Sequence, residues 1–179
     1  MSTILAIDTS TSRTSVALVA DGKVLFTKFH EDPLAHGEVL PKLVKEALSV
    51  NKDIDLVAVG MGPGPFTGLR VGISFAHTFG LARNIPVIGV CSLDAIAAQI
   101  KENDFIITVD ARRKEVYWAR YTNGVRISDP AVNFPADVSG ATIHADLFPD
   151  MVSLSSLSGN ITEPIYLRRP DAVATADRP

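Results

Sequence analysis

The sequence contains a single cysteine, Cys91, among its 179 residues. One thiol cannot form a disulfide within the chain, so the composition fits a reducing compartment and we expect a cytoplasmic location. Cys91 ends an apolar run, where a buried thiol acts as a small hydrophobic side chain. The sequence also has no His-x-x-x-His or Cys-x-x-Cys pair, which argues against zinc, so we predict no metal site.

A strong excess of charge and long apolar runs are also absent. The net charge of −3 gives no global attraction to nucleic acid or to an anionic membrane. No apolar run approaches the ~18 residues that a membrane-spanning helix needs. The glycine-rich loop at 60–64 is not followed by Gly-Lys-Ser or Gly-Lys-Thr, so it is not a Walker A motif. Ser10, Ser12 and Thr67 have no His–Asp pattern near them, so we predict no catalytic residue.

The chain does contain short apolar runs separated by turn signals such as Asp21-Gly22. Three strands followed by alternating helices and strands predict an α/β fold with a mixed sheet. In chain order we predict strands at Thr3–Ile7, Ser15–Ala20 and Val24–Phe29, a helix at His36–Val50, a strand at Leu56–Val59, a helix at Gly68–Ala82 capped by Thr67, a strand at Val87–Val90, and a helix capped by Ser92 that runs through Ile96–Ile100.

The second part of the chain repeats the opening pattern in reduced form. Predicted strands at Phe105–Val109 and Val116–Tyr121 precede a second hairpin signal, Asn123-Gly124. We find no amphipathic helix between Ser128 and Gly159. The sequence therefore predicts two lobes, with an N-terminal lobe at residues 1–103 and a reduced C-terminal lobe at 104–179 that contains a closing strand at Pro164–Arg168 and a frayed tail at Asp171–Pro179.

The predicted helix at Gly68–Ala82 has almost no polar face. Small residues recur along it every fourth position, at Gly68, Gly72, Ala76 and Gly80. Glycine within a helix costs about 1 kcal/mol relative to alanine, so this ridge requires a reason, and close approach of another backbone is one. Two interpretations stay open: the ridge packs inside its own domain, or it faces a partner chain.

The polar turn after the first strand is the candidate anion site. Asp8 ends the strand, and the hydroxyl residues that follow it can, with successive backbone N–H groups, surround a phosphate. The signal is weak, because such polar turns join many hairpins. The candidate nucleotide-binding residues, in a site that is degenerate if it exists, are Asp8, Ser10, Thr11 and Ser12.

Several motifs together resemble the TsaB family, also called YeaZ: AIDTSTSRTSVAL, HGEVLP, GPGPFTGLRVG, PVIGVCSLDAIA, VDARRKEVYWARY and EPIYLR. The resemblance covers Thr3–Tyr121 and returns at Glu163–Arg168. It implies an actin-like ATPase (ribonuclease H-like) fold. It also implies a non-catalytic scaffold role in making threonylcarbamoyladenosine in tRNA, with a catalytic TsaD-type subunit and a TsaE-type ATPase as partners. The tRNA would be reached only through that complex.

Three departures agree with a role without catalysis. Two metal-binding histidines of TsaD-type relatives fall on Ser92 and Ile96, which do not replace them as ligands. Where actin-type enzymes bring a glycine-rich turn to phosphate after an Asp, Asp110 is followed here by the bulky run 111–114. Arg112 can still contact an anion, although a solvated basic turn is the simpler interpretation. The alternative function is an ATP-binding phosphotransferase or ATPase of the same superfamily.

The two long predicted helices are the expected partner surface. They are consecutive crossovers of the first lobe, and by resemblance the same face would serve a homodimer of the isolated protein and the pairing with TsaD. An apolar face shared between two chains is typical of such interfaces. The predicted interface residues are Leu40, Leu43, Val44, Ala47, Leu69, Gly72, Ile73, Ala76, Phe79 and Gly80.

Overall fold

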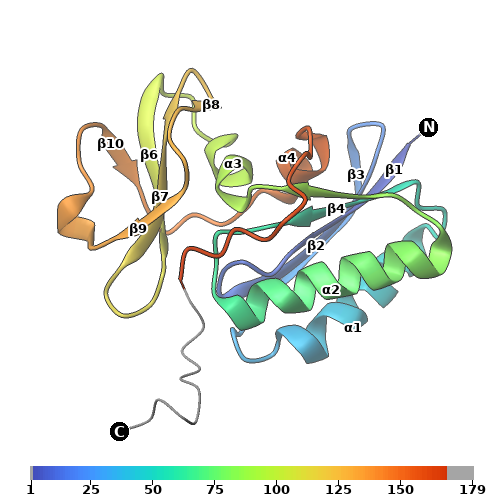
Figure 1. Ribbon diagram of the computed structural model, residues 1–179. Helices are drawn as coiled ribbons and strands as arrows, with labels where there is room; N and C mark the ends of the chain where they lie inside the picture. The colour runs from blue at the N-terminus through green and yellow to red at the C-terminus, as the bar shows by residue number, and fades with distance from the viewer. Residues whose placement is uncertain (1, 169–179) are drawn as a thin grey trace, which may run out of the picture.

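A computed structural model describes residues 2–168 and contains two sheets of five strands each (Figure 1). In the first sheet the order is β3-β2-β1-β4-β5. Its strands are β1 (Thr3–Asp8), β2 (Arg13–Ala20), β3 (Lys23–Glu31), β4 (Leu56–Gly60) and β5 (Val87–Val90). β1, β2 and β3 form an antiparallel meander, while β4 and β5 run parallel to β1. This mixed order confirms the predicted fold class.

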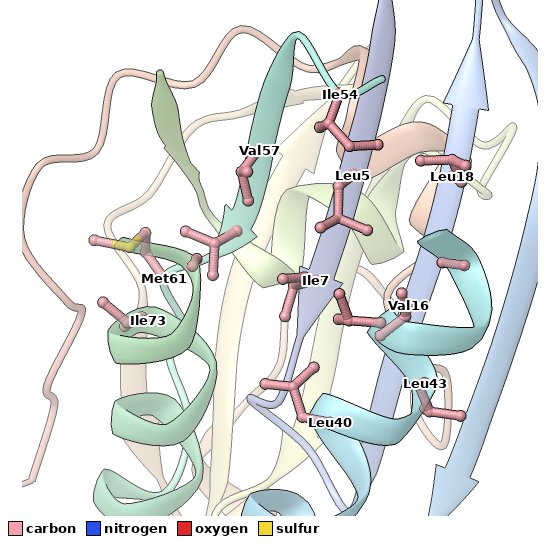
Figure 2. Close-up of a cluster of buried hydrophobic side chains, with 14 of the residues drawn as sticks. Leu5, Ile7, Val16, Leu18, Leu40, Leu43, Ile54, Val57, Met61 and Ile73 are labelled. Atoms are coloured by element: carbon pink, nitrogen blue, oxygen red, sulfur yellow. The ribbon is translucent and has the colours of Figure 1, made fainter. Parts of the chain in front are cut away.

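Two long helices lie side by side on one face of this sheet (Figure 1). They are α1 (His36–Val50) and α2 (Phe66–Arg83). Figure 2 shows Leu40 and Leu43 of α1 directed at the strands, where they meet Ile7 and Val16 in the main hydrophobic core. Burial of this stripe explains why the pattern at His36–Val50 folds as predicted.

The predicted caps of two helices are wrong. α2 begins two residues earlier than expected, with Pro65 at its N-cap. No side chain accepts from its first turn, and Thr67 lies inside the helix. A proline at this boundary has φ preset for helix entry and no N–H to satisfy. α3 (Ser92–Ala97) is capped by Cys91 without a side-chain bond, and Ser92 instead bonds elsewhere.

α3 and a fourth helix, α4 (Met151–Ser156), cover the opposite face. Small strand residues at Ala6, Ala17 and Ala58 meet Met151 and Leu154 there. The sequence analysis did not predict α4, because its six residues give too short a pattern. Asp150 caps it by accepting from the backbone N of Ser153 at 2.7 Å.

The second sheet follows from Asp104 onward. Its strands are β6 (Asp104–Asp110), β7 (Val116–Thr122), β8 (Val125–Arg126), β9 (Ala131–Asn133) and β10 (Thr142–His144). A short 3-10 helix at Pro135–Asp137 joins the last two. The Asn123-Gly124 turn has positive φ at both residues, as does Asp21-Gly22, so both hairpin predictions are confirmed. α3 lies between the two sheets, with Ile96 packed against Phe105.

The closing segment contains no strand, contrary to the prediction at Pro164–Arg168. It crosses between the lobes as irregular chain, held by bonds from Ile161 N to Gly89 O at 3.2 Å and from Ile165 N to Met61 O at 2.8 Å. Such isolated bonds do not extend a ladder. The predicted frayed tail at 171–179 lies outside the described residues. The division after residue 103 stays a prediction; the second sheet starts at Asp104, although α4 returns to the first sheet.

No helix within residues 2–168 is long and apolar enough to cross a membrane. Cys91 is buried, and burial raises the pKa of its thiol to about 12, so the thiolate is not available as a nucleophile near neutral pH.

Candidate functional site

Asp8 is enclosed by its own chain. Its Oδ1 accepts from the backbone N of Ser10 at 2.8 Å and from Ser10 Oγ at 2.7 Å, while Oδ2 accepts from Ser92 Oγ at 2.6 Å. A Cβ at Gly60 would overlap the carboxylate, so only glycine leaves room for it on β4. Burial raises the pKa of Asp8 above its ordinary value, and the three hydrogen bonds oppose that rise. The carboxylate therefore faces inward and joins β1 to α3.

Ser92 occupies the first position of α3. It is one of the two positions that the resemblance in the sequence analysis aligns with metal-binding histidines of TsaD-type relatives. Besides donating to Asp8, its Oγ accepts from the backbone N of Gly62 at 3.3 Å. Ile96, at the second histidine position, is fully buried between α3 and the second sheet. Both positions are therefore used for internal contacts, one polar and one apolar.

The ridge of small residues on α2 packs inside the chain. Thr9 Oγ1 donates to the carbonyl of Gly68 at 2.7 Å and accepts from the backbone N of Gly72 at 3.1 Å. A Cβ at Gly72 would collide with that hydroxyl, and one at Gly80 would collide with Val87. Of the two open interpretations, the structure places the ridge against the sheet and the β1–β2 turn. Close approach of the polar turn is the reason for Gly68 and Gly72, and close approach of Ile85 and Val87 is the reason for Gly80.

Most of the residues predicted for a partner interface lie in the core of the chain itself. All of them except Phe79 are buried in the chain's own core: Leu40, Leu43, Val44 and Ala47 on α1, and Leu69, Gly72, Ile73, Ala76 and Gly80 on α2. Their apolar stripes fill the sheet face, so their side chains are not on the surface. That the two helices form a partner surface stays a prediction, and it now concerns other residues of the same helices.

α2 also carries an apolar strip at the edge of the main core, and the sequence analysis singled out only Phe79 of it. Val71, Phe75 and Phe79 are only partly buried, and the last two stack with ring centroids 6.1 Å apart. We call these three residues the outer strip. Leu81, two residues beyond Phe79, is 86% exposed. The i, i+4, i+8 spacing of the outer strip is visible in the sequence. The sequence analysis could not separate these residues from the core-facing residues of the same helix, because the whole segment is apolar.

The candidate nucleotide site divides in two. Thr11 and Ser12 line a cavity of about 170 Å³ between the lobes, together with Asp110, Arg112 and Asp146. Asp8 and Ser10 do not reach it, because both are buried behind the turn. Asp110, the counterpart of Asp8 in the second hairpin, is exposed and accepts from the backbone N of Arg112 at 2.9 Å. The turn predicted as one site therefore contributes only its outer half to the cavity.

A larger cavity of about 360 Å³ lies beside it, and the sequence analysis did not predict it. It is lined by the N-terminus of α2, the β6–β7 turn and the closing segment: Gly64, Pro65, Phe66, Thr67, Ala111, Arg112, Arg113, Tyr117, Tyr166 and Arg168. These residues come from segments about 50 residues apart, so their meeting depends on the docking of the two lobes.

Comparison with known proteins places this geometry in context. The family model described as TsaD, tRNA N6-adenosine threonylcarbamoyltransferase, matches residues 33–170. A Mycobacterium tuberculosis protein described as uncharacterized is 44% identical over 201 residues, which cover 96% of this chain and 94% of that protein. The Escherichia coli tRNA threonylcarbamoyladenosine biosynthesis protein TsaB is 39% identical over 126 residues, covering 66% of this chain and 54% of that protein.

Solved structures agree with the sequence relatives. YeaZ from Pseudomonas aeruginosa superposes with a TM-score of 0.75 at 28% identity, covering 87% of this chain and 90% of that one. A second Pseudomonas aeruginosa structure, described as similar to peptidase YEAZ, gives a TM-score of 0.80 over 94% of this chain and all of the other, again at 28% identity.

Proposed function

The chain belongs to the TsaB (YeaZ) family, and from this membership we propose that it is a non-catalytic scaffold subunit in the synthesis of threonylcarbamoyladenosine in tRNA. Its catalytic partner would be a TsaD-type subunit, a TsaE-type ATPase would join the complex, and tRNA would be bound through that complex. A tRNA substrate would place this work in the cytoplasm.

The observation that carries the proposal is the hydrogen bond between Asp8 and Ser92. A catalytic centre needs its carboxylate directed at substrate or metal. Here three internal donors hold the carboxylate, and the positions of the related metal ligands are filled by Ser92 and Ile96. A reactive carboxylate would require this buried network to break. Each hydrogen bond lost would cost a free energy of about 1–3 kcal/mol, because the acceptor is a charged group.

The outer strip supports the pairing part of the proposal. α1 and α2 together form the broadest helical face of the first lobe (Figure 1), and Phe75 and Phe79 expose aromatic surface on it. Aromatic residues are enriched in the parts of interfaces that contribute most to affinity. Two copies joined across a two-fold axis here would form an antiparallel four-helix contact, and a TsaD-type subunit would use the same face.

One observation favours the second candidate, a nucleotide-dependent phosphotransferase or ATPase. Thr11, Ser12 and Asp110 do meet at the cavity between the two turns. That candidate predicts ATP turnover by the purified chain alone. The scaffold proposal predicts turnover below about 0.1 per second, slow against the usual enzyme range. Faster turnover that disappears in Thr11→Ala but persists in the control Thr122→Ala would favour the enzyme.

The pairing test compares glutamate substitutions of two apolar residues, one partly buried and one exposed, with thermal melts to confirm that each variant is folded. Phe75→Glu lies in the outer strip, whereas Val125→Glu lies in the β7–β8 hairpin of the other lobe. We expect Phe75→Glu to lower affinity for a TsaD-type subunit at least about tenfold, the size of a ~1.4 kcal/mol loss, and to reduce tRNA modification in a reconstituted reaction. Val125→Glu should change neither. Equal pairing by both variants would contradict the proposal.

A further inference from the structure

The cavity beside the α2 N-terminus has an unusual lining for an acidic protein. Arg112, Arg113 and Arg168 line it, and within residues 2–168 no acidic side chain does. Arg168 forms an ion pair with Glu115 and donates to the carbonyl of Arg112 at 3.3 Å, so its guanidinium is held at the rim. Arg112 lies 4.0 Å from Asp110 in an exposed, loose pair. The cavity therefore gathers three guanidinium groups, two of them paired with the carboxylates of Glu115 and Asp110, in a chain whose net charge is −3.

Aromatic rings also line the cavity. Phe66 and Tyr166 approach with centroids 5.0 Å apart at a tilt of 43°, and Tyr117 lines the cavity nearby. Tyr166 is 41% exposed, so its ring is partly available to a ligand, whereas Tyr117 is nearly buried. An exposed ring next to guanidinium groups is the arrangement that holds unstacked bases and their phosphates.

The β6–β7 turn positions its cations through unusual backbone geometry. Arg112, Arg113 and Lys114 have φ values of 63°, 54° and 63°, a run of three left-handed non-glycine residues. Glycine would adopt this conformation without strain, but it would remove the cationic side chains. Bonds from Ala111 N to Glu115 O at 2.9 Å and from Glu115 N to Arg112 O at 3.0 Å close the turn. Strained backbone clusters at ligand-binding sites, so this turn beside the cavity is a candidate ligand contact.

We infer that this cavity binds a single unpaired nucleotide of RNA, with its phosphate at the arginines and its base on Tyr166. The inference rests on the proposed function, in which an RNA is the substrate of the complex. A volume of about 360 Å³ accommodates one nucleotide and excludes a duplex. The sparse charge implies weak binding by the chain alone, with a dissociation constant of roughly 10⁻⁴ M or above at low salt.

The test measures binding of an oligouridylate hexamer to the full chain across a range of salt concentrations. Arg112→Gln should weaken binding at least about fivefold and reduce the salt slope by about 0.7, the value of one single-strand phosphate contact. Tyr166→Ala should weaken binding at least about fivefold without changing that slope, since stacking involves no counterion. Thermal melts confirm that each variant is folded.

Two control variants match these changes. Arg83→Gln removes one positive charge from the other end of α2 and should stay within about twofold of wild type, as should Tyr166→Phe, which keeps the ring. Unchanged affinity in both Arg112→Gln and Tyr166→Ala would overturn the inference. Uridine 5′-monophosphate binding as tightly as the hexamer would assign a free nucleotide instead, and a hexa-aspartate peptide binding as tightly would show a general anion site; either result overturns it.

The two proposals fail separately. Arg112 and Tyr166 are not part of the outer strip, so their variants should still pair with a TsaD-type subunit. If they keep full RNA affinity while Phe75→Glu loses pairing, the RNA inference fails and the scaffold role stands. If they lose RNA affinity while Phe75→Glu pairs normally, the scaffold role fails and the RNA site stands.

Discussion

At the scale of single residues, Asp8 shows that a carboxylate at the end of a strand can be held entirely by its own chain. The aspartate still ends β1, but Gly60 and Ser92 make a closed place for its carboxylate. A buried carboxylate without these donors would destabilise the fold, because an unsatisfied buried charge costs several kcal/mol of folding free energy. The network therefore explains why the residue remains although it does not reach the cavity.

Replacing Asp8 with alanine should mainly destabilise the fold. The variant leaves Ser92 Oγ and two Ser10 donors without their acceptor, and we expect the free energy of unfolding to fall by about 2–3 kcal/mol. Denaturant unfolding measures this loss. Pairing with a TsaD-type subunit, assayed at a temperature where the variant is folded, should remain. An unchanged midpoint together with lost modification activity would reverse this assignment.

The raised pKa of Asp8 predicts a pH dependence of stability. Because burial raises the pKa of the folded state above the unfolded value of 3.8, the folded chain binds the proton more tightly. This contribution to stability is full below the unfolded pKa and is lost as pH rises through the folded pKa. Asp8→Asn, which cannot titrate, should therefore lose less stability than wild type as pH rises from about 3.8. Parallel unfolding curves for the two proteins across pH would contradict the assignment.

At the scale of secondary-structure elements, the sequence predicted what local pattern and turn chemistry determine. Both Asx-Gly hairpins and the α1 stripe appear as expected, because each depends on neighbouring residues. α4 and the closing segment were not predicted correctly, since their conformations depend on docking against the first sheet. The direction of the α2 ridge was left open for the same reason: periodicity locates a face but does not say what covers it.

The ridge itself offers a direct test. Ala76 is fully buried, so Ala76→Leu adds volume to a filled core and should lower the free energy of unfolding by about 1–3 kcal/mol. Ser74→Leu adds a similar side chain on the exposed side of the same helix and should leave stability within about 0.5 kcal/mol. Thermal melts and sedimentation of both variants compare core and surface. An Ala76→Leu protein as stable as wild type but unable to dimerise would assign the ridge to a partner instead.

At the scale of the whole molecule, the two proposed tasks use different surfaces. The α1–α2 side of the first sheet carries the outer strip, while the arginine-lined cavity lies where the β6–β7 turn meets the other end of the closing segment. Asp94 joins the lobes through Tyr121 at 2.7 Å and Arg126 at 2.9 Å, which fixes α3 against the second sheet. Because the cavity is lined from both sides of this junction, a partner bound to the α1–α2 face would keep it in a constant position.

If one face serves both pairings, homodimer and heterodimer must compete. Each copy of the chain would bury the same outer strip, so a chain already in a homodimer has none to offer. The apparent affinity for a TsaD-type subunit should then weaken as the concentration of the chain rises, because dissociation of the homodimer is added to every binding event. Titrations at several chain concentrations, with sedimentation to identify the species, measure this shift.

Phe79→Glu should weaken both pairings in parallel, and the control Val125→Glu should weaken neither. A complex that holds two copies of the chain through the outer strip while a TsaD-type subunit is bound would show that the faces are separate.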